Sequence, residues 1–225
     1  MTFPAQCLAT ASAVLFDLDG VLVDSLRVVE RSWRRWAADQ HLEADDVLAE
    51  IHGRRAAELV RMFAPQLDPV QEVVRITGYE TEDGGGELTA IPGAQESVDV
   101  ARQGRWAVVT SGGRDLALLR LAAVGLPVPA VLVTGDDVEH GKPDPAPYLR
   151  AAALLDVPAG ECVVVEDAPA GVLAARRAGM TVLAVATTHP TDALTAADLV
   201  FPGMDEVAGY LRGSLGQARS DAPRV

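Results

Sequence analysis

The chain has 225 residues, 49% of them apolar, which is enough for one globular domain or one domain carrying a smaller insert. Its net charge of −13 repels nucleic acid and anionic membranes, so neither is an expected partner. The two cysteines, Cys7 and Cys162, form no disulfide framework or metal motif. Residues 1–13 lack the basic start of a signal peptide, and no apolar run reaches about 18 residues. We therefore expect a cytoplasmic protein.

Short apolar runs predict six buried strands, and helical patterns fill the intervals between them. The expected strands are 13–16, 106–109, 130–133, 162–165, 181–185 and 198–200. The expected helices are 94–102, 115–124, 145–155, 170–178 and 204–211. Strands that alternate with helices predict an α/β fold, a Rossmann-like doubly wound parallel sheet. The tail 213–225 has little apolar content, and we expect it to be disordered.

Residues 26–88 interrupt this alternation. They contain helical patterns at 28–40, 45–51, 56–63 and 69–79 and no clear strand. The glycine-rich residues 83–86 are typical of a flexible return linker. The sequence therefore predicts a core of residues 1–24 and 89–225 and an inserted all-helical cap domain of residues 25–88. Two such units can open and close around a ligand.

Two aspartates stand directly after the first predicted strand, in the run Asp17-Leu18-Asp19-Gly20. Doubly wound sheets bind ligands at the carboxyl ends of their strands, so both carboxylates can face one pocket. Asp17 could attack a phosphorus atom, and Asp19 could protonate the leaving oxygen and then activate water. Gly20 permits the tight turn that such a site needs. An aspartate-rich turn without any chemical role fits the same residues.

Two further segments supply groups that bind anions. Thr110, Ser111 and Gly112 follow the second predicted strand and precede a helix, so their hydroxyl and N–H groups can form an anion site. Lys142 is the only lysine among 19 basic residues, and it precedes the helix at 145–155. Its compact positive charge can neutralise a phosphate together with an attacking carboxylate. Taken singly, each segment also fits an ordinary turn or a solvated side chain.

Glu166 and Asp167 follow the strand at 162–165. Mg²⁺ prefers oxygen ligands and commonly takes one or two carboxylates, so Asp167 could complete a metal site that Asp17 begins. Glu166 is expected beside it. A helix cap ahead of Pro169 is an equally ordinary use of Asp167.

A loop in the predicted cap, His52-Gly53-Arg54-Arg55, joins two helical patterns. A glycine hinge and two cations could bring this loop over the sheet to meet a phosphorylated substrate. Surface arginines are the plainer interpretation of the same residues. The core segments are more informative together than singly, because all of them follow strands or adjoin the face where ligands bind.

In this order the motifs resemble those of the haloacid dehalogenase superfamily of phosphatases, over roughly residues 14–211. The resemblance implies that Asp17 is the nucleophile, Asp19 the acid and base, Thr110 a phosphate binder and Lys142 a charge neutraliser. The implied ligands of Mg²⁺ are Asp17, the Asp19 carbonyl, Asp167 and often Glu166. An insert after the first motif resembles the helical cap of that superfamily's first cap class.

The runs Val29-Glu30-Arg31, Ile51-His52-Gly53-Arg54 and 163–172 resemble sugar-phosphate and glycerol-phosphate phosphatases. This resemblance implies a Mg²⁺-dependent phosphoric monoester hydrolase that acts on a small sugar or polyol phosphate through an aspartyl-phosphate. The expected partner is therefore a small-molecule phosphate ester. A monomer is the default expectation, and a dimer stays open.

A β-phosphoglucomutase-type phosphosugar mutase is the main alternative, because it shares these motifs and this cap class. Such mutases carry a histidine early in the first cap helix, where this chain has Val29. Haloacid dehalogenation is disfavoured because it needs no second aspartate, whereas Asp19 is present. A catalytically idle scaffold on the same fold is disfavoured because no catalytic position is substituted.

Overall fold

A central parallel sheet organises the computed structural model, which describes residues 11–84 and 86–220. Its six strands lie in the order β5-β4-β1-β6-β7-β8, and every neighbouring pair is parallel. The chain builds outward from β1 on one side and then crosses back to build the other side, so the topological switch point lies at β1. The strands are β1 (Ala13–Phe16), β4 (Arg105–Val109), β5 (Val131–Val133), β6 (Cys162–Glu166), β7 (Thr181–Val185) and β8 (Leu199–Phe201).

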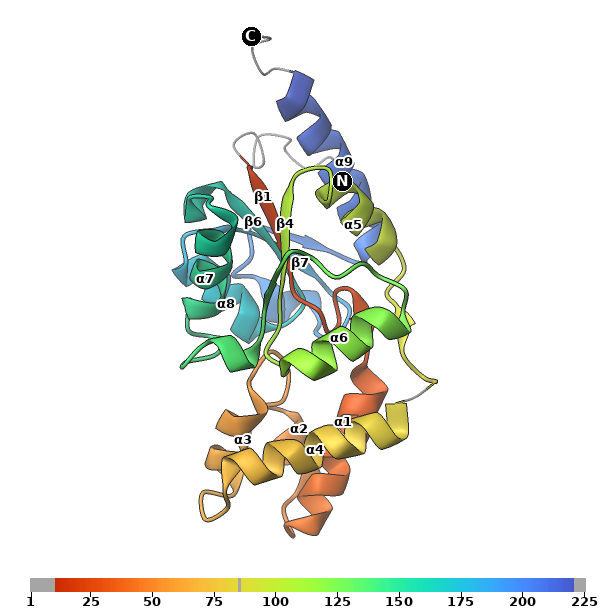
Figure 1. Cartoon of the computed structure of the whole chain (residues 1–225), viewed down its shortest axis with the longest axis vertical. Coiled ribbons are helices and arrows are strands. Elements are labelled where there is room, and N and C mark those ends of the chain that lie inside the picture. Colours follow the sequence, from red (N-terminus) through yellow and green to blue (C-terminus); the bar gives the residue numbers. More distant parts are fainter. Residues whose placement is uncertain (1–10, 85, 221–225) are drawn as a thin grey trace.

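Helices cover both faces of this sheet (Figure 1). One face packs against α5 (Ala94–Ala101), α6 (Arg114–Ala123) and α9 (Met204–Ser220), and the other against α7 (Ala146–Leu155) and α8 (Pro169–Arg177). In β1, Val14 and Phe16 point into the first layer, whereas Ala13 and Leu15 point into the second. Burial on both faces explains why the strands are continuous apolar runs. The predicted α/β, Rossmann-like doubly wound fold is confirmed.

Among the described residues, three short 3₁₀ helices lie in the connections, at Gly135–Asp137, Ala159–Glu161 and Thr191–Leu194. None of the described helices is both long enough and apolar enough to cross a membrane.

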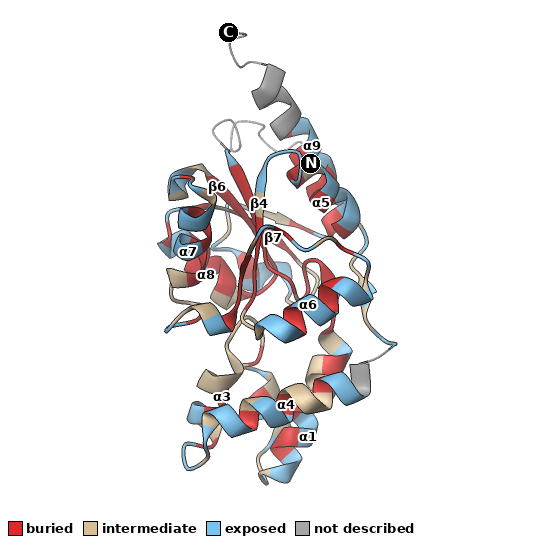
Figure 2. Cartoon of the chain, viewed as in Figure 1, coloured by how far each residue is buried: buried red, intermediate tan, exposed pale blue. Residues whose placement is uncertain are grey.

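A helical insert (residues 26–84) leaves the sheet after β1 and packs below its carboxyl end (Figure 1). Its helices are α1 (Leu26–Asp39), α2 (Ala44–Leu48), α3 (Ala56–Phe63) and α4 (Pro69–Gly84). They enclose a separate apolar core, visible in Figure 2, in which Trp33 and Trp36 meet edge to face with centroids 5.4 Å apart. Two short antiparallel strands, β2 (Val23–Asp24) and β3 (Thr89–Ala90), bracket the insert.

Two boundary predictions were wrong. The tail was expected to be disordered from residue 213, but α9 continues to Ser220; residues 221–225 lie outside the described part. Met204, Val207 and Leu211 anchor α9 against the core, and extending an existing helix costs little. The linker at 83–86 was expected to be flexible, but Asp83 and Gly84 end α4 and Gly86 lies in a turn, while residue 85 is not described.

Candidate active site

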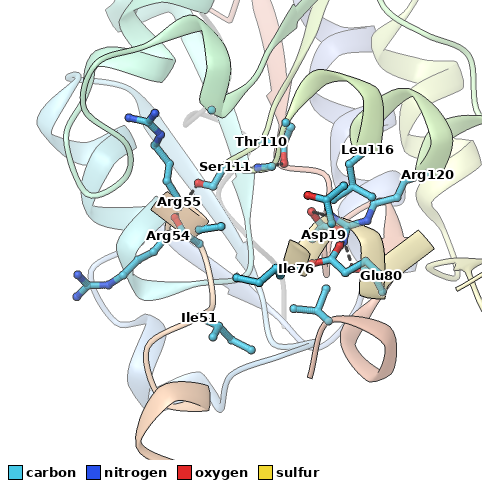
Figure 3. A pocket seen from close by; sticks show the side chains of 18 of the residues that line it. Asp19, Ile51, Arg54, Arg55, Ile76, Glu80, Thr110, Ser111, Leu116 and Arg120 are labelled. Carbon is cyan, nitrogen blue, oxygen red and sulfur yellow. Dashed lines mark hydrogen bonds and ion pairs between the residues drawn. The ribbon is translucent and has the colours of Figure 1, made fainter. Parts of the chain in front are cut away.

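A cavity of about 430 Å³ lies between the carboxyl ends of the strands and the helical insert. Figure 3 shows its walls, to which both units contribute. Asp17, Asp19, Thr110 and Asp167 line it from the core, and His52 is among the residues that line it from the insert. The cavity therefore lies at the place where doubly wound sheets bind ligands.

Asp17 is the first residue after β1 and is 5% exposed. Its N–H donates to the carbonyl of Val165 at 3.0 Å, which extends the pairing of β1 with β6 by one residue. Its Oδ1 lies 2.5 Å from Nζ of Lys142. Burial raises the pKa of Asp17 to about 7, with Lys142 opposing the rise and Glu166 adding to it.

Lys142 is 1% exposed and supplies the positive charge of this cluster. Besides Asp17, its ammonium donates to Oε1 of Glu166 at 2.7 Å and to the carbonyl of Val109 at 3.1 Å. Burial alone would lower the pKa of Lys142, but the adjacent carboxylates of Asp17 and Glu166 outweigh burial and raise it. All three ammonium hydrogens thus have an acceptor, and Lys142 stays charged.

Asp17, Glu166 and Asp167 form a buried carboxylate cluster. One oxygen of each residue lies within 4.8 Å of the others, so the three can hold one metal ion. Burial raises the pKa of Asp167, and the charges of Glu166 and Asp17 raise it further. When all three are ionised, three carboxylates against one lysine leave excess negative charge in a buried site. An oxygen-binding divalent cation would balance that charge, so the donor set fits such an ion.

Two glycines let the backbone pass close to these carboxylates. A Cβ on Gly171, at the start of α8, would lie 1.6 Å from Oε1 of Glu166. A Cβ on Gly20 would lie 2.0 Å from Oδ2 of Asp167, and Gly20 has a φ of +77°. Any side chain at either position would displace a carboxylate of the cluster.

The loop after β4 faces the same cavity. Thr110 is 3% exposed, and its Oγ1 accepts a hydrogen bond from the N–H of Gly112 at 3.1 Å. Ser111 donates through its hydroxyl to the carbonyl of Gly53 in the insert at 2.9 Å. The structure therefore places the predicted phosphate binders at the cavity, but the Ser111 hydroxyl is engaged by the insert.

The predicted cap loop also borders the cavity, but its two arginines point elsewhere. Figure 3 shows the guanidinium groups of Arg54 and Arg55 directed away from Asp19. Arg54 pairs with Glu50 at 3.0 Å, and Arg55 donates to the carbonyl of Glu139 at 2.6 Å. His52 instead lies against His189, with ring centroids 5.2 Å apart, and burial lowers the pKa of both rings.

Asp19 lies apart from the carboxylate cluster, on the side of α6 and α4. Its Oδ1 accepts from Oγ of Ser25 at 2.6 Å, and its Oδ2 accepts from Nη1 of Arg120 at 2.7 Å. Nη2 of Arg120 is 2.5 Å from Oε2 of Glu80, a residue of the insert.

Sequence reasoning missed several residues of this site. Tyr148 donates to Oε1 of Glu166 at 2.7 Å, and Thr188 donates to Oδ2 of Asp167. Thr188 lies three residues beyond the end of β7, so the strand-end argument could have found it. Arg120 could have been noticed in another way. It occupies the same helix face as Leu116 and Ala117, at a position where the helical pattern predicts an apolar residue. Glu80 gave no signal that we recognise.

Comparison with known proteins identifies the family. The family model for haloacid dehalogenase-like hydrolases matches residues 11–179. The chain belongs to this family. It is therefore a hydrolase, and the family resemblance inferred from the motifs is confirmed.

Named relatives and a solved structure agree with that assignment. The chain is 43% identical to hexitol phosphatase A of Escherichia coli, over 86% of this chain and 91% of the relative. It is 33% identical to glycerol-1-phosphate phosphohydrolase 1 of Saccharomyces cerevisiae, over 81% and 78%. A candidate beta-phosphoglucomutase from Bacteroides vulgatus superposes with a TM-score of 0.75 at 31% identity, covering 91% of this chain and 90% of that one.

The charge balance at Lys142 generates a stability prediction. Lys142→Met leaves buried carboxylates without their counter-charge, which typically costs about 3–5 kcal/mol of unfolding free energy. The loss should be smaller near pH 5 than near pH 8, because the buried carboxyls can then take up protons. Urea denaturation at both pH values measures the difference.

Arg176→Gln is the matched control, because Arg176 pairs with Asp198 while its side chain is 48% exposed. An exposed pair should cost less than about 1 kcal/mol. Equal losses from the two substitutions would show that the Lys142 cluster carries no special electrostatic weight.

Proposed function

We propose that this hydrolase is a Mg²⁺-dependent phosphomonoester hydrolase that acts on a small sugar or polyol phosphate through an aspartyl-phosphate. The observation that carries this proposal is the position of Asp17. Its buried carboxylate adjoins Lys142 and lies within reach of Glu166 and Asp167, beside a cavity of about 430 Å³. A cavity of this size suits a small phosphorylated metabolite.

In the proposed first step, an oxygen of Asp17 attacks phosphorus and the bond to the leaving oxygen breaks. Asp19 gives a proton to that oxygen, so the alcohol departs neutral. In the second step Asp19 takes a proton from water, the water oxygen attacks phosphorus, and the bond between phosphorus and the Asp17 oxygen breaks. Inorganic phosphate leaves, and both aspartates return to their starting states.

The remaining core residues stabilise the phosphoryl oxygens. Lys142 stands at Oδ1 of Asp17, and the Thr110–Gly112 loop faces the cavity. Fixed donors of this kind supply most of the stabilisation in phosphoryl transfer. Mg²⁺, when bound by Asp17, Asp167, Glu166 and the Asp19 carbonyl, would add positive charge beside the same oxygens.

We also propose that residues 25–88 act as a cap domain and that His52, Gly53, Arg54 and Arg55 govern substrate choice. The insert touches the core through a few polar contacts, such as Ser111 with Gly53, and these are easily exchanged for water. Opening would admit substrate, and closure would exclude water. In the present arrangement His52 lines the cavity, whereas reorientation of Arg54 and Arg55 would be needed for direct substrate contact.

The relatives suggest the substrate class. Hexitol phosphatase A and glycerol-1-phosphate phosphohydrolase 1 are both named for phosphates of small polyols. We therefore propose polyol phosphates as the first substrates to test. The strongly negative chain makes a cytoplasmic metabolite a better partner than a nucleic acid or a membrane lipid.

Replacing the nucleophile tests this proposal. Asp17→Asn preserves the shape of the side chain but removes the attacking carboxylate, so turnover should fall on the order of 10⁴-fold or more. Phosphate release from hexitol phosphates, glycerol phosphate and p-nitrophenyl phosphate, with Mg²⁺ and with chelator, provides the measurement.

Substantial activity in Asp17→Asn would refute the role given to Asp17. Failure of the parent protein to hydrolyse any phosphate ester would favour a scaffold. Conversion of β-glucose 1-phosphate to the 6-phosphate without phosphate release would favour the mutase, the alternative that Val29 disfavours.

The carboxylate cluster predicts how metal binding depends on pH. The pKa of Asp17 rises from 3.8 to about 7 on folding, and that of Asp167 also rises. In this window the folded state binds more protons than the unfolded state, so metal-free stability falls as pH increases toward 7. A divalent cation binds the ionised carboxylates and removes this penalty.

Mg²⁺ at about 100 times its Kd should therefore raise Tm by roughly 5–10 °C near pH 8 and by much less near pH 5. Thermal unfolding followed by circular dichroism measures the shift. Asp167→Asn should abolish it, whereas the control Asp156→Asn, at an exposed site outside the cavity, should retain it. A shift of equal size at both pH values would contradict a site built from these carboxylates.

A further inference from the structure

An arginine outside the predicted motifs connects the acid–base candidate to the helical insert. Arg120 belongs to α6 and is 4% exposed. Its Nη1 is 2.7 Å from Oδ2 of Asp19, and its Nη2 is 2.5 Å from Oε2 of Glu80 on α4. Figure 3 shows the three side chains converging at one wall of the cavity. Arg120 therefore bridges a carboxylate of the core and a carboxylate of the insert.

The arrangement holds both oxygens of the Asp19 carboxylate. Arg120 donates to Oδ2, and Ser25 donates to Oδ1 at 2.6 Å. Donors from two different elements leave the carboxylate little freedom to rotate. Its side chain nevertheless keeps 29% exposure and lines the cavity, so the proposed proton can be held on an oxygen that substrate can reach.

The geometry suits arginine in particular. A planar guanidinium presents its donors in a fixed fork, so the position of one partner constrains that of the other. Glu80 is buried, with 8% of its side chain exposed, and Arg120 is the cation that pairs with it. An unpaired buried charge is costly, so Glu80 and Arg120 are expected to stay paired for as long as the insert lies on the core.

We propose that Arg120 and Glu80 are positioning residues that set the Asp19 carboxyl against the leaving oxygen when the insert lies on the core. Since Glu80 belongs to the insert, closure and correct placement of the acid become one event. This inference rests on the proposed phosphatase function and on the role given there to Asp19. It assigns neither Arg120 nor Glu80 any contact with the phosphoryl group.

Aryl phosphates of similar shape can test acid placement. Nitrophenolate departs readily without a proton, whereas the more basic phenolate depends on the acid. The value of kcat/KM reports the step in which Asp17 is phosphorylated, and therefore the step in which Asp19 acts as an acid. The measurement is kcat/KM for phenyl phosphate and p-nitrophenyl phosphate with saturating Mg²⁺, for the full chain and its variants.

Arg120→Met should lower kcat/KM for phenyl phosphate about 10- to 100-fold, because a small misplacement of the acid costs that much, and for p-nitrophenyl phosphate by less than about 3-fold. Glu80→Gln should give a weaker loss with the same selectivity. Asp19→Asn is the reference, with a loss on the order of 10²–10⁴-fold for phenyl phosphate.

Glu72→Gln is the matched control for Glu80→Gln. Glu72 lies on the same helix, is 5% exposed and accepts a hydrogen bond from Nε1 of Trp36 at 2.8 Å inside the insert. Glu72→Gln should leave the ratio of kcat/KM for phenyl phosphate to kcat/KM for p-nitrophenyl phosphate unchanged. The double variant Glu80→Leu/Arg120→Met leaves no unpaired buried charge of this pair, and it should fold yet keep the selective loss.

Equal losses on both substrates would show that Arg120 and Glu80 serve only the fold, and would overturn the inference. Faster hydrolysis of phenyl phosphate by Arg120→Met would also overturn it, because Arg120 would then restrain Asp19. A parent protein that hydrolyses neither aryl ester nor any sugar or polyol phosphate would instead refute the proposed function on which the inference rests.

Discussion

The burial of one ammonium among carboxylates is the interaction on which the site depends. β1 and β6 are neighbours in register, so Asp17 and Glu166 end side by side, and Lys142 reaches between them from the connection before α7. None of these charges would be stable alone in an interior that excludes water. Together they hold a carboxylate in place beside the cavity. When its carboxylates are ionised, the cluster carries excess negative charge that a divalent cation would balance.

In the proposed function, the helical insert opens and closes over this fixed cluster. Its contacts with the core are few and polar, and they occur at opposite walls of the cavity. Gly53 meets Ser111 on one side and Glu80 meets Arg120 on the other. Opening would expose these polar groups to water, which could replace their partners, so the insert could move without disturbing either apolar core. The cluster around Asp17 can therefore stay preorganised while substrate enters and product leaves.

The sequence predicted the parts of the site that depend on local rules. Parallel strands deliver the residues that follow them to one edge of the sheet, so Asp17, Thr110 and Asp167 could be placed from strand ends alone. The pairing of Arg120 with Glu80 could not, because it joins residues 40 positions apart in the chain and depends on how the insert packs on the core. The side-chain directions of Arg54 and Arg55 likewise depend on how the insert packs on the core.

The predicted boundaries of some helices and strands were wrong for a related reason. The strands β2 and β3 have two residues each, too few to show a period. Helix α9 packs against α5, a contact that the composition of the tail did not reveal. Short-range patterns therefore gave the sheet and its ligand-binding edge, whereas contacts between distant segments decided where helices end and which polar side chains pair.

The most direct test of the central claim is to trap the phosphorylated carboxylate. The protein is mixed with Mg²⁺ and a substrate that it turns over, quenched in acid within one turnover and digested, and the peptides are examined by mass spectrometry. One added phosphoryl group is expected on the peptide that contains Asp17, and none in Asp17→Asn. Rapid turnover with Asp17 unmodified at every quench time, or with the phosphoryl group on another residue, would contradict it.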